Sequence, residues 1–118
     1  PGARKHVIRA DSARPETISH MRRSGFPMIR KARKGAGSVE EGVNFLKDFD
    51  IIVDPRCRHA IDELGAYSYK IDPHTGDVLP VLADKKNHVI DSLRYATEER
   101  RRASGKSAAA LPQVLEVV

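Results

Sequence analysis

The sequence predicts an α/β domain with a short, mainly parallel sheet, flanking helices and one β-hairpin. Short apolar runs alternate with segments of helical periodicity over residues 6–66, an order typical of parallel β-α-β units. Residues 50–54 form an apolar run between two aspartates, followed by Pro55, as expected of a buried parallel strand. Residues 66–82 instead alternate around turn residues, which predicts a hairpin.

The chain is expected to open with a β-α-β unit. A strand over residues 6–10 leads into Asp11, and Ser12 is the expected cap of the helix that follows, with Pro15 in its first turn. A second strand is expected over residues 27–32. The pattern therefore places a carboxylate at the carboxyl end of the first strand.

Three further helices are expected downstream. Ser38 and Glu41 match a capping box, and the helix that they would open has three apolar residues on one face: Val39, Val43 and Leu46. Another helix should end near Gly65. The last helix is expected over residues 88–102, with an apolar stripe made of Val89, Leu93 and Ala96.

The predicted organisation is one domain over residues 1–102 and a flexible tail over residues 103–118, where Ser, Gly and a run of Ala gather. The strands over 6–10 and 50–54 are expected to be parallel neighbours in the sheet. The chain begins with Pro1 rather than Met, so we expect it to be a piece cut from a longer protein.

Composition and charge favour an ordinary globular domain with a polyanionic partner. The chain has 118 residues, of which 21 are Lys or Arg and 16 are Asp or Glu, giving a net charge of +5 and a sequence pI near 9.6. No apolar run is long enough to span a membrane, and no secretory signal opens the chain. The single cysteine, Cys57, fits a reducing compartment.

One carboxylate and imidazole pair stands out in the last predicted helix. His88 and Asp91 are three residues apart, so their side chains share one helical face. Asp11 lies at a strand end, where ligands of parallel α/β sheets collect. Together the three side chains predict a site for Mg²⁺ or Mn²⁺. The alternative is that Asp11 caps the next helix and that His88 and Asp91 form a solvated edge.

Basic residues form a second signal. Six cations lie within thirteen positions that contain no acid: Arg22, Arg23, Arg30, Lys31, Arg33 and Lys34. Residues 100–102 form a second basic run. Such runs are typical of solvated faces, and they also suit contacts to nucleic-acid phosphates. The candidate DNA-binding residues are Arg30, Arg33 and Lys34.

Four segments resemble the C-terminal nuclease domain of tailed-phage terminase large subunits. They are residues 10–16, 34–42, 67–70 and 84–96, and the resemblance spans about residues 6–97. The most specific segment is Asn-His-x-x-Asp-x-Leu-Arg-Tyr-Ala, which begins at Asn87.

The resemblance implies a ribonuclease H-like fold, partial in this chain, and a two-metal endonuclease that cuts concatemeric phage DNA during genome packaging. By position, Asp11 resembles the second catalytic aspartate of the family, and His88 and Asp91 resemble its metal-binding pair. Asp84 matches a further acidic position, so the implied metal ligands are Asp11, Asp84, His88 and Asp91. The implied cofactor is Mg²⁺ or Mn²⁺.

Two departures from the family pattern bear on activity. The family's first catalytic aspartate lies on a strand upstream of the one that carries Asp11, and no such strand exists in this sequence. The family's ATPase motor is also missing from the pattern. Residues 104–107 resemble the end of a P-loop, but the P-loop motif requires a glycine at position 100, where this chain has arginine. We therefore expect a fragment that is inactive on its own.

In the full-length parent, the resemblance implies double-stranded DNA as substrate and the portal protein and terminase small subunit as partners. The parent would act in the cytoplasm of the bacterial host, without a membrane association. An alternative function is a non-catalytic module that binds nucleic acid or docks on the portal, using the basic face and the hairpin of residues 66–82. Metal titration separates the two, because a docking module should ignore Mn²⁺.

Overall fold

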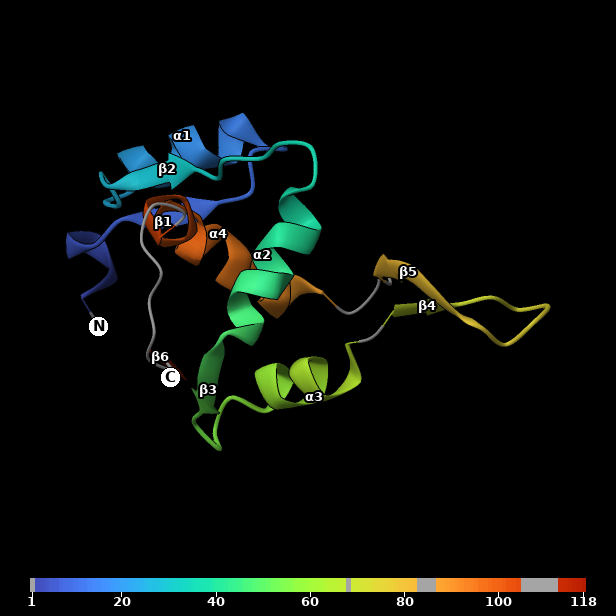
Figure 1. Ribbon diagram of the computed structural model, residues 1–118. Coiled ribbons are helices and arrows are strands. Elements are labelled where there is room, and N and C mark those ends of the chain that lie inside the picture. The colour runs from blue at the N-terminus through green and yellow to red at the C-terminus, as the bar shows by residue number, and fades with distance from the viewer. Residues whose placement is uncertain (1, 68, 83–86, 105–112) are drawn as a thin grey trace.

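The computed structural model describes residues 2–67, 69–82, 87–104 and 113–118 (Figure 1). Helices and strands alternate along most of this chain, as expected of an α/β domain. In order, the elements are η1 (Ala3–Lys5), β1 (Ile8–Ala10), α1 (Pro15–Arg23), β2 (Ile29–Lys31), α2 (Ser38–Lys47), β3 (Phe49–Val53), α3 (Arg58–Ala66), β4 (Tyr69–Ile71), β5 (Val78–Leu82), α4 (His88–Ser104) and β6 (Gln113–Val117).

The expected β-α-β unit at the start of the chain is confirmed. Strands β1 and β2 are parallel, with Ile8 opposite Ile29 and Arg9 opposite Arg30. The ladder continues beyond the strands, because the amide of Ala32 donates to the carbonyl of Ala10 over 2.7 Å. Helix α1 packs on β2, whereas α4 packs on β1. The carboxyl ends of β1 and β2 therefore meet at one edge.

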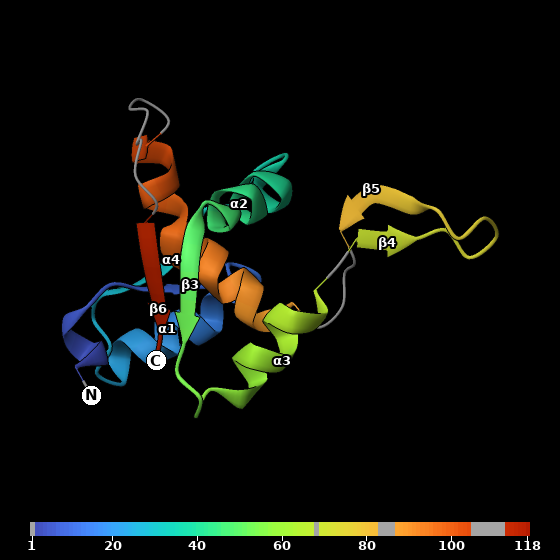
Figure 2. The same cartoon turned by 60° about the horizontal axis from the view of Figure 1, so that its bottom comes forward.

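The pairing expected between residues 6–10 and 50–54 is wrong. Strand β1 pairs with β2, and β3 pairs in parallel with β6, so the described strands form separate two-stranded sheets. The two strands β3 and β6 lie side by side in Figure 2. Strand β1 pairs with β2 rather than with β3 because only α1 lies between β1 and β2 in the sequence. Bringing these two strands together therefore closes a shorter segment of chain.

The prediction of a flexible tail from residue 103 onward is wrong for the described residues at the end of the chain. Helix α4 runs to Ser104, and residues 113–117 form β6. In that strand, positions 113, 115 and 117 are half-buried and positions 114 and 116 are exposed. Alternating burial over five residues is typical of a strand. The Ala-rich run before residue 113 led to the prediction of a tail instead. Residues 105–112 lie outside the described part.

The predicted hairpin is confirmed, and it projects from the rest of the molecule in both views (Figures 1 and 2). Strands β4 and β5 are antiparallel. Asp72 organises the turn, because one carboxylate oxygen accepts the amide of His74 over 2.8 Å. The turn closes at Gly76, whose φ of 75° is left-handed. Ile71 and Val78, which pair across the hairpin, are 62% and 68% exposed, so these two side chains lie outside the core.

Helix α4 is the centre of the fold, in contact with α2, α3 and β1. The apolar stripe expected along it is wrong in part, because Ala96 is exposed. The buried face consists of Ile90, Arg94, Tyr95, Thr97 and Glu98. Arg94 and Glu98 are buried because each has charged partners, which offsets the cost of removing its charge from water.

Two expected helix caps are absent. Helix α1 begins after Arg14 rather than being capped by Ser12, and no side chain bonds to its first amides. Helix α2 begins after Gly37, whose φ is 72°, and the expected capping box of Ser38 is not formed. At the start of α4, a buried side chain from another helix binds one of the first amides. Oε1 of Glu63 accepts a hydrogen bond from the amide of Ile90 over 2.9 Å.

In the described residues, no helix has the length and apolar character needed to cross a membrane.

Candidate functional site

Asp11 lies directly after β1, as the sequence predicts, and its carboxylate accepts hydrogen bonds from its surroundings. Oδ1 accepts a hydrogen bond from the amide of Ala13 over 3.0 Å and lies 2.5 Å from Nζ of Lys34. The hydrogen bond from Lys34, followed by the one from Ala13, lowers the pKa of the Asp11 carboxyl below its usual value. The side chain is 54% exposed, so a ligand from solvent can reach it.

Lys34 reaches Asp11 because it follows β2, whose carboxyl end adjoins that of β1. Its Nζ also lies 5.5 Å from the ring centroid of Tyr95. The hydrogen bond to Asp11 is the main reason that the pKa of Lys34 is raised. The sequence offered Lys34 as a DNA contact, and its partnership with Asp11 could not be read from a separation of 23 residues.

Asp91 is held by a buried arginine one helical turn away. Nη2 and Nε of Arg94 lie 2.6 Å and 3.2 Å from Oδ1 of Asp91. The Arg94 side chain is 7% exposed, and its third nitrogen donates to the carbonyl of Ser38 over 3.3 Å. Helix α2 leaves room for it at Gly42, where a Cβ would lie 2.9 Å from Cδ of Arg94. The guanidinium therefore fixes the position of the Asp91 carboxylate.

His88 is the first residue of α4, which confirms the predicted start of this helix. It is exposed, and its carbonyl accepts a hydrogen bond from the hydroxyl of Ser92 over 2.8 Å. Its three-residue separation from Asp91 keeps both side chains on one face of the helix. Asp84, the fourth candidate ligand, lies outside the described residues.

The aromatic ring of Tyr95 links the two carboxylates. Tyr95 is buried at 9% exposure, and the guanidinium carbon of Arg94 lies 5.2 Å from its ring centroid. Because Lys34 contacts the same ring, Asp11 and Asp91 are joined through a chain of contacts that runs over Lys34, Tyr95 and Arg94.

The expected cluster of Asp11, His88 and Asp91 is not assembled as a metal site. Within the parts of the chain that the structure describes, no three His, Cys, Asp or Glu side chains are grouped so that they could hold a metal ion. Both aspartates face cations instead. Their role as metal ligands stays a prediction.

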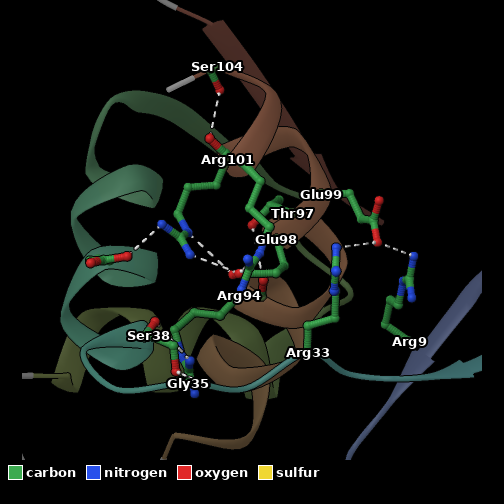
Figure 3. Close-up of polar contacts among 12 residues, drawn as sticks. Arg9, Arg33, Gly35, Ser38, Arg94, Thr97, Glu98, Glu99, Arg101 and Ser104 are labelled. Carbon is green, nitrogen blue, oxygen red and sulfur yellow. Dashed lines mark hydrogen bonds and ion pairs between the residues drawn. The ribbon is translucent and has the colours of Figure 1, made fainter. Parts of the chain in front are cut away.

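The basic run at the end of α4 is paired inside the molecule rather than free for DNA. Glu98, with a side chain 6% exposed, accepts hydrogen bonds from Arg101 and Arg102. Figure 3 shows the guanidinium of Arg101 turned toward Glu98. Arg101 also lies 2.6 Å from Glu41. Burial alone would raise the pKa of Glu98, but the two arginines outweigh it and lower that pKa. Arg100 bonds to Gln113 over 2.6 Å.

The structure thus has one carboxylate, Asp11, after β1 and another, Asp91, in the first turn of α4. Contacts through the ring of Tyr95 connect the two. A family model described as "Terminase RNAseH like domain" matches residues 2–99. The crystal structure of the large-terminase nuclease domain from bacteriophage SPP1, determined with bound Mn, matches with a TM-score of 0.74 and 36% identity. The alignment covers 82% of this chain and 56% of the SPP1 domain.

Two curated relatives agree with this match. The terminase large subunit of Bacillus phage SPP1 is 39% identical over 103 residues, or 85% of this chain. The PBSX phage terminase large subunit of Bacillus subtilis (strain 168) is 31% identical over 106 residues, or 89% of this chain. The chain spans about a quarter of each relative, 24% in both cases. By the extent of the family match, this chain belongs to the terminase ribonuclease H-like domain family.

Proposed function

We propose that the chain is part of the nuclease domain of a phage or prophage terminase large subunit. The full-length protein would be a metal-dependent endonuclease that cuts concatemeric double-stranded DNA during genome packaging. One observation carries the proposal. Asp11 and Asp91 lie on opposite sides of a contact chain around Tyr95, in a chain that matches a nuclease domain crystallised with Mn.

The donor chemistry of these residues fits a hard divalent cation. The contacts of Ala13 and Lys34 end on Oδ1 of Asp11, and those of Arg94 end on Oδ1 of Asp91. The second oxygen of each carboxylate lies outside these contacts, so it can take a metal. Asp11, Asp91 and Asp84 would hold Mg²⁺ or Mn²⁺ through oxygen, and His88 would add a ring nitrogen or orient water.

A pair of such ions, when bound, activates water for in-line attack on a phosphodiester and stabilises the leaving oxygen. The chain's own residues prepare the ligands. Lys34 lowers the pKa of Asp11 through a hydrogen bond, which favours the charged form of this carboxylate. Arg94 keeps Asp91 in one place, because its own side chain is enclosed at 7% exposure. Lys34, at 44% exposure, has room to leave when a metal arrives.

We expect the 118-residue chain to cleave DNA poorly by itself. Two-metal chemistry requires several carboxylates to balance the charge and fix the geometry of both ions. The match covers 56% of the SPP1 nuclease domain, so further ligands have room to lie in the remaining part of a parent protein. We expect the family's first catalytic aspartate to lie there.

DNA contact through Arg30, Arg33 and Lys34 is part of the same proposal, together with the portal protein and the terminase small subunit as partners in the parent. The parent would work in the cytoplasm of the bacterial host. Arg30 and Arg33 are both exposed and stand beside the edge that carries Asp11. Lys34 would reach DNA only after releasing Asp11.

A second function is favoured by one observation, namely that both aspartates already have cationic partners. Carboxylates paired in this way serve equally well as structural groups in a non-catalytic module that binds DNA or docks on the portal. In that case divalent ions would change neither the binding of DNA nor the DNA itself.

Nicking of supercoiled plasmid DNA distinguishes the two functions. The nuclease proposal predicts that Mn²⁺ changes DNA binding and supports at most slow nicking, and that both effects of Mn²⁺ disappear in Asp91→Asn. Asp62→Asn is the matched control, because Asp62 is an exposed aspartate on α3 and is not one of the candidate ligands. Nicking that survives Asp91→Asn would reveal a contaminant, and an absence of nicking with no effect of Mn²⁺ on DNA binding would favour the docking module.

A further inference from the structure

A cleft of about 530 Å³ opens between α1, the paired strands β1 and β2, and α4. Its charged lining consists of five cations and one carboxylate: Arg9, Arg22, Arg30, Lys31, Arg33 and Glu99. The hydroxyls of Ser12 and Ser19 also line it. Such a lining, with a net charge of 5 − 1 = +4, suits an anion with several oxygen acceptors.

The register of the strands places two like charges opposite each other. Arg9 on β1 pairs with Arg30 on β2, so both side chains leave the same face of the strand pair. Two cations in directly opposite positions repel each other and destabilise a sheet unless an anion lies between them. The sequence alone could not show this, because it gives no register.

Glu99 supplies only part of the missing negative charge. Its Oε1 lies 2.7 Å from Nη2 of Arg9 and 3.8 Å from Nη1 of Arg33, and both guanidinium groups turn toward it (Figure 3). Among the residues that the structure describes, the partners of Arg30 are the main-chain carbonyls of Pro27 and Ile29, at 3.4 Å and 3.3 Å. The cleft therefore keeps an excess of positive charge.

We propose that this cleft binds a phosphate of the DNA backbone, and that Glu99 is an internal counterion which the phosphate replaces. The guanidinium groups match the oxygens of a phosphodiester, and the two serine hydroxyls can donate to it. The carboxylate of Glu99 holds Arg9 and Arg33 in place until then. This inference rests on the proposed function in taking DNA as the polyanion.

The position of the cleft favours duplex DNA over a free phosphate ion. Arg9 and Asp11 are two residues apart at the end of β1, and Arg33 and Lys34 are neighbours after β2. A duplex with one phosphate at the candidate metal ligands would therefore pass over the cleft. Because Arg33 and Glu99 are 57% and 54% exposed, the cleft is open enough for a backbone to enter.

The test measures the salt dependence of binding to a 20-base-pair duplex by fluorescence anisotropy, in EDTA, so that cleavage does not contribute. Replacing Arg30 and Arg33 by Ala should release the one phosphate held in the cleft and reduce the log–log slope by about 0.9, the value per phosphate contact. Arg56→Ala with Arg58→Ala is the matched control, since these two exposed arginines lie before and at the start of α3. Urea unfolding confirms that each variant is folded.

Equal slopes for the cleft variant and the control variant would overturn the proposal, even if the chain nicks DNA in the presence of Mn²⁺. Conversely, a cleft-dependent slope in a chain for which Mn²⁺ changes neither DNA binding nor nicking would support the cleft and count against the nuclease. Failure of the two proposals is therefore distinguishable.

Glu99→Gln tests the counterion. Freeing Arg9 and Arg33 should tighten DNA binding about two- to five-fold, the range expected from losing a surface ion pair. Glu116→Gln on β6 removes the same charge from another surface and should have a smaller effect. Unchanged or weaker binding by Glu99→Gln would contradict the role of Glu99. Inorganic phosphate should compete no better than chloride at equal ionic strength, and saturable competition at the cleft would identify a free-phosphate site instead.

Discussion

The two aspartates of the candidate site are both paired with cations, but their surroundings differ. The pair of Asp91 and Arg94 is enclosed, with the arginine side chain 7% exposed and packed against α2. The pair of Asp11 and Lys34 is open, at 54% and 44% exposure. The difference indicates that Asp91 is fixed before any ligand arrives, whereas Asp11 has a partner that can be displaced.

Arg94→Ala should have the largest effect on stability. Removing one member of a largely buried ion pair leaves the other charge uncompensated, which costs about 3 kcal/mol. The side chain also fills the space beside Gly42, so its loss leaves a void. Urea unfolding measures the change. Arg56→Ala is the control, because Arg56 is 87% exposed in its pair with Asp54 and should leave the midpoint unchanged. Equal effects would show that the Arg94 pair is not structural.

Gly42→Ala tests the packing of Arg94 against α2 by adding a methyl group on the α2 side. An alanine in a helix is normally more stable than glycine by about 1 kcal/mol. At position 42 the added Cβ would lie 2.9 Å from Cδ of Arg94, so we expect a loss of about 1–2 kcal/mol instead. Gly65→Ala in α3 meets nothing within 4 Å and should be stabilising. A stabilising Gly42→Ala would mean that Arg94 can move aside.

Lys34→Met should have a smaller effect on stability, visible mainly in titration. The pKa of Asp11 is lowered by Lys34, so the pair stabilises the fold above the usual pKa of an aspartate, near pH 4. That contribution is lost as the pH falls through the lowered pKa, and solvent screening keeps it below about 1 kcal/mol. Carboxyl NMR should show the Asp11 pKa returning toward its usual value in Lys34→Met. No change would contradict the pairing.

The same contrast explains how far the sequence predicted the molecule. The strand that leads into Asp11 and the helix that begins at His88 follow from local patterns, and both are confirmed. The burial of Arg94 depends on a glycine that is far away in the sequence, at position 42. The pairing of β3 with β6 depends on residues 113–117, which an Ala-rich run separates from the rest. Contacts between distant segments leave no periodic signal in the chain.

In the candidate site too, features within one helix were predictable, whereas contacts between distant segments were not. Spacing within one helix predicts that His88 and Asp91 share a face. The partner of each aspartate is harder to predict, because Lys34 reaches Asp11 only through the parallel pairing of β1 and β2. The resemblance to terminase nucleases predicts Asp11 and Asp91 as metal ligands, and it did not indicate that both would face cations.

We propose that a fixed Asp91 and an adjustable Asp11 hold the same metal centre. Titration of the isotope-labelled chain with Mn²⁺, followed by NMR line broadening, tests this most directly. The account predicts that substoichiometric Mn²⁺ broadens the amide signals of residues 11–13 and 88–91 together, and that Asp91→Asn abolishes both effects. Broadening at only one of the two segments, or at neither, would contradict a shared metal centre.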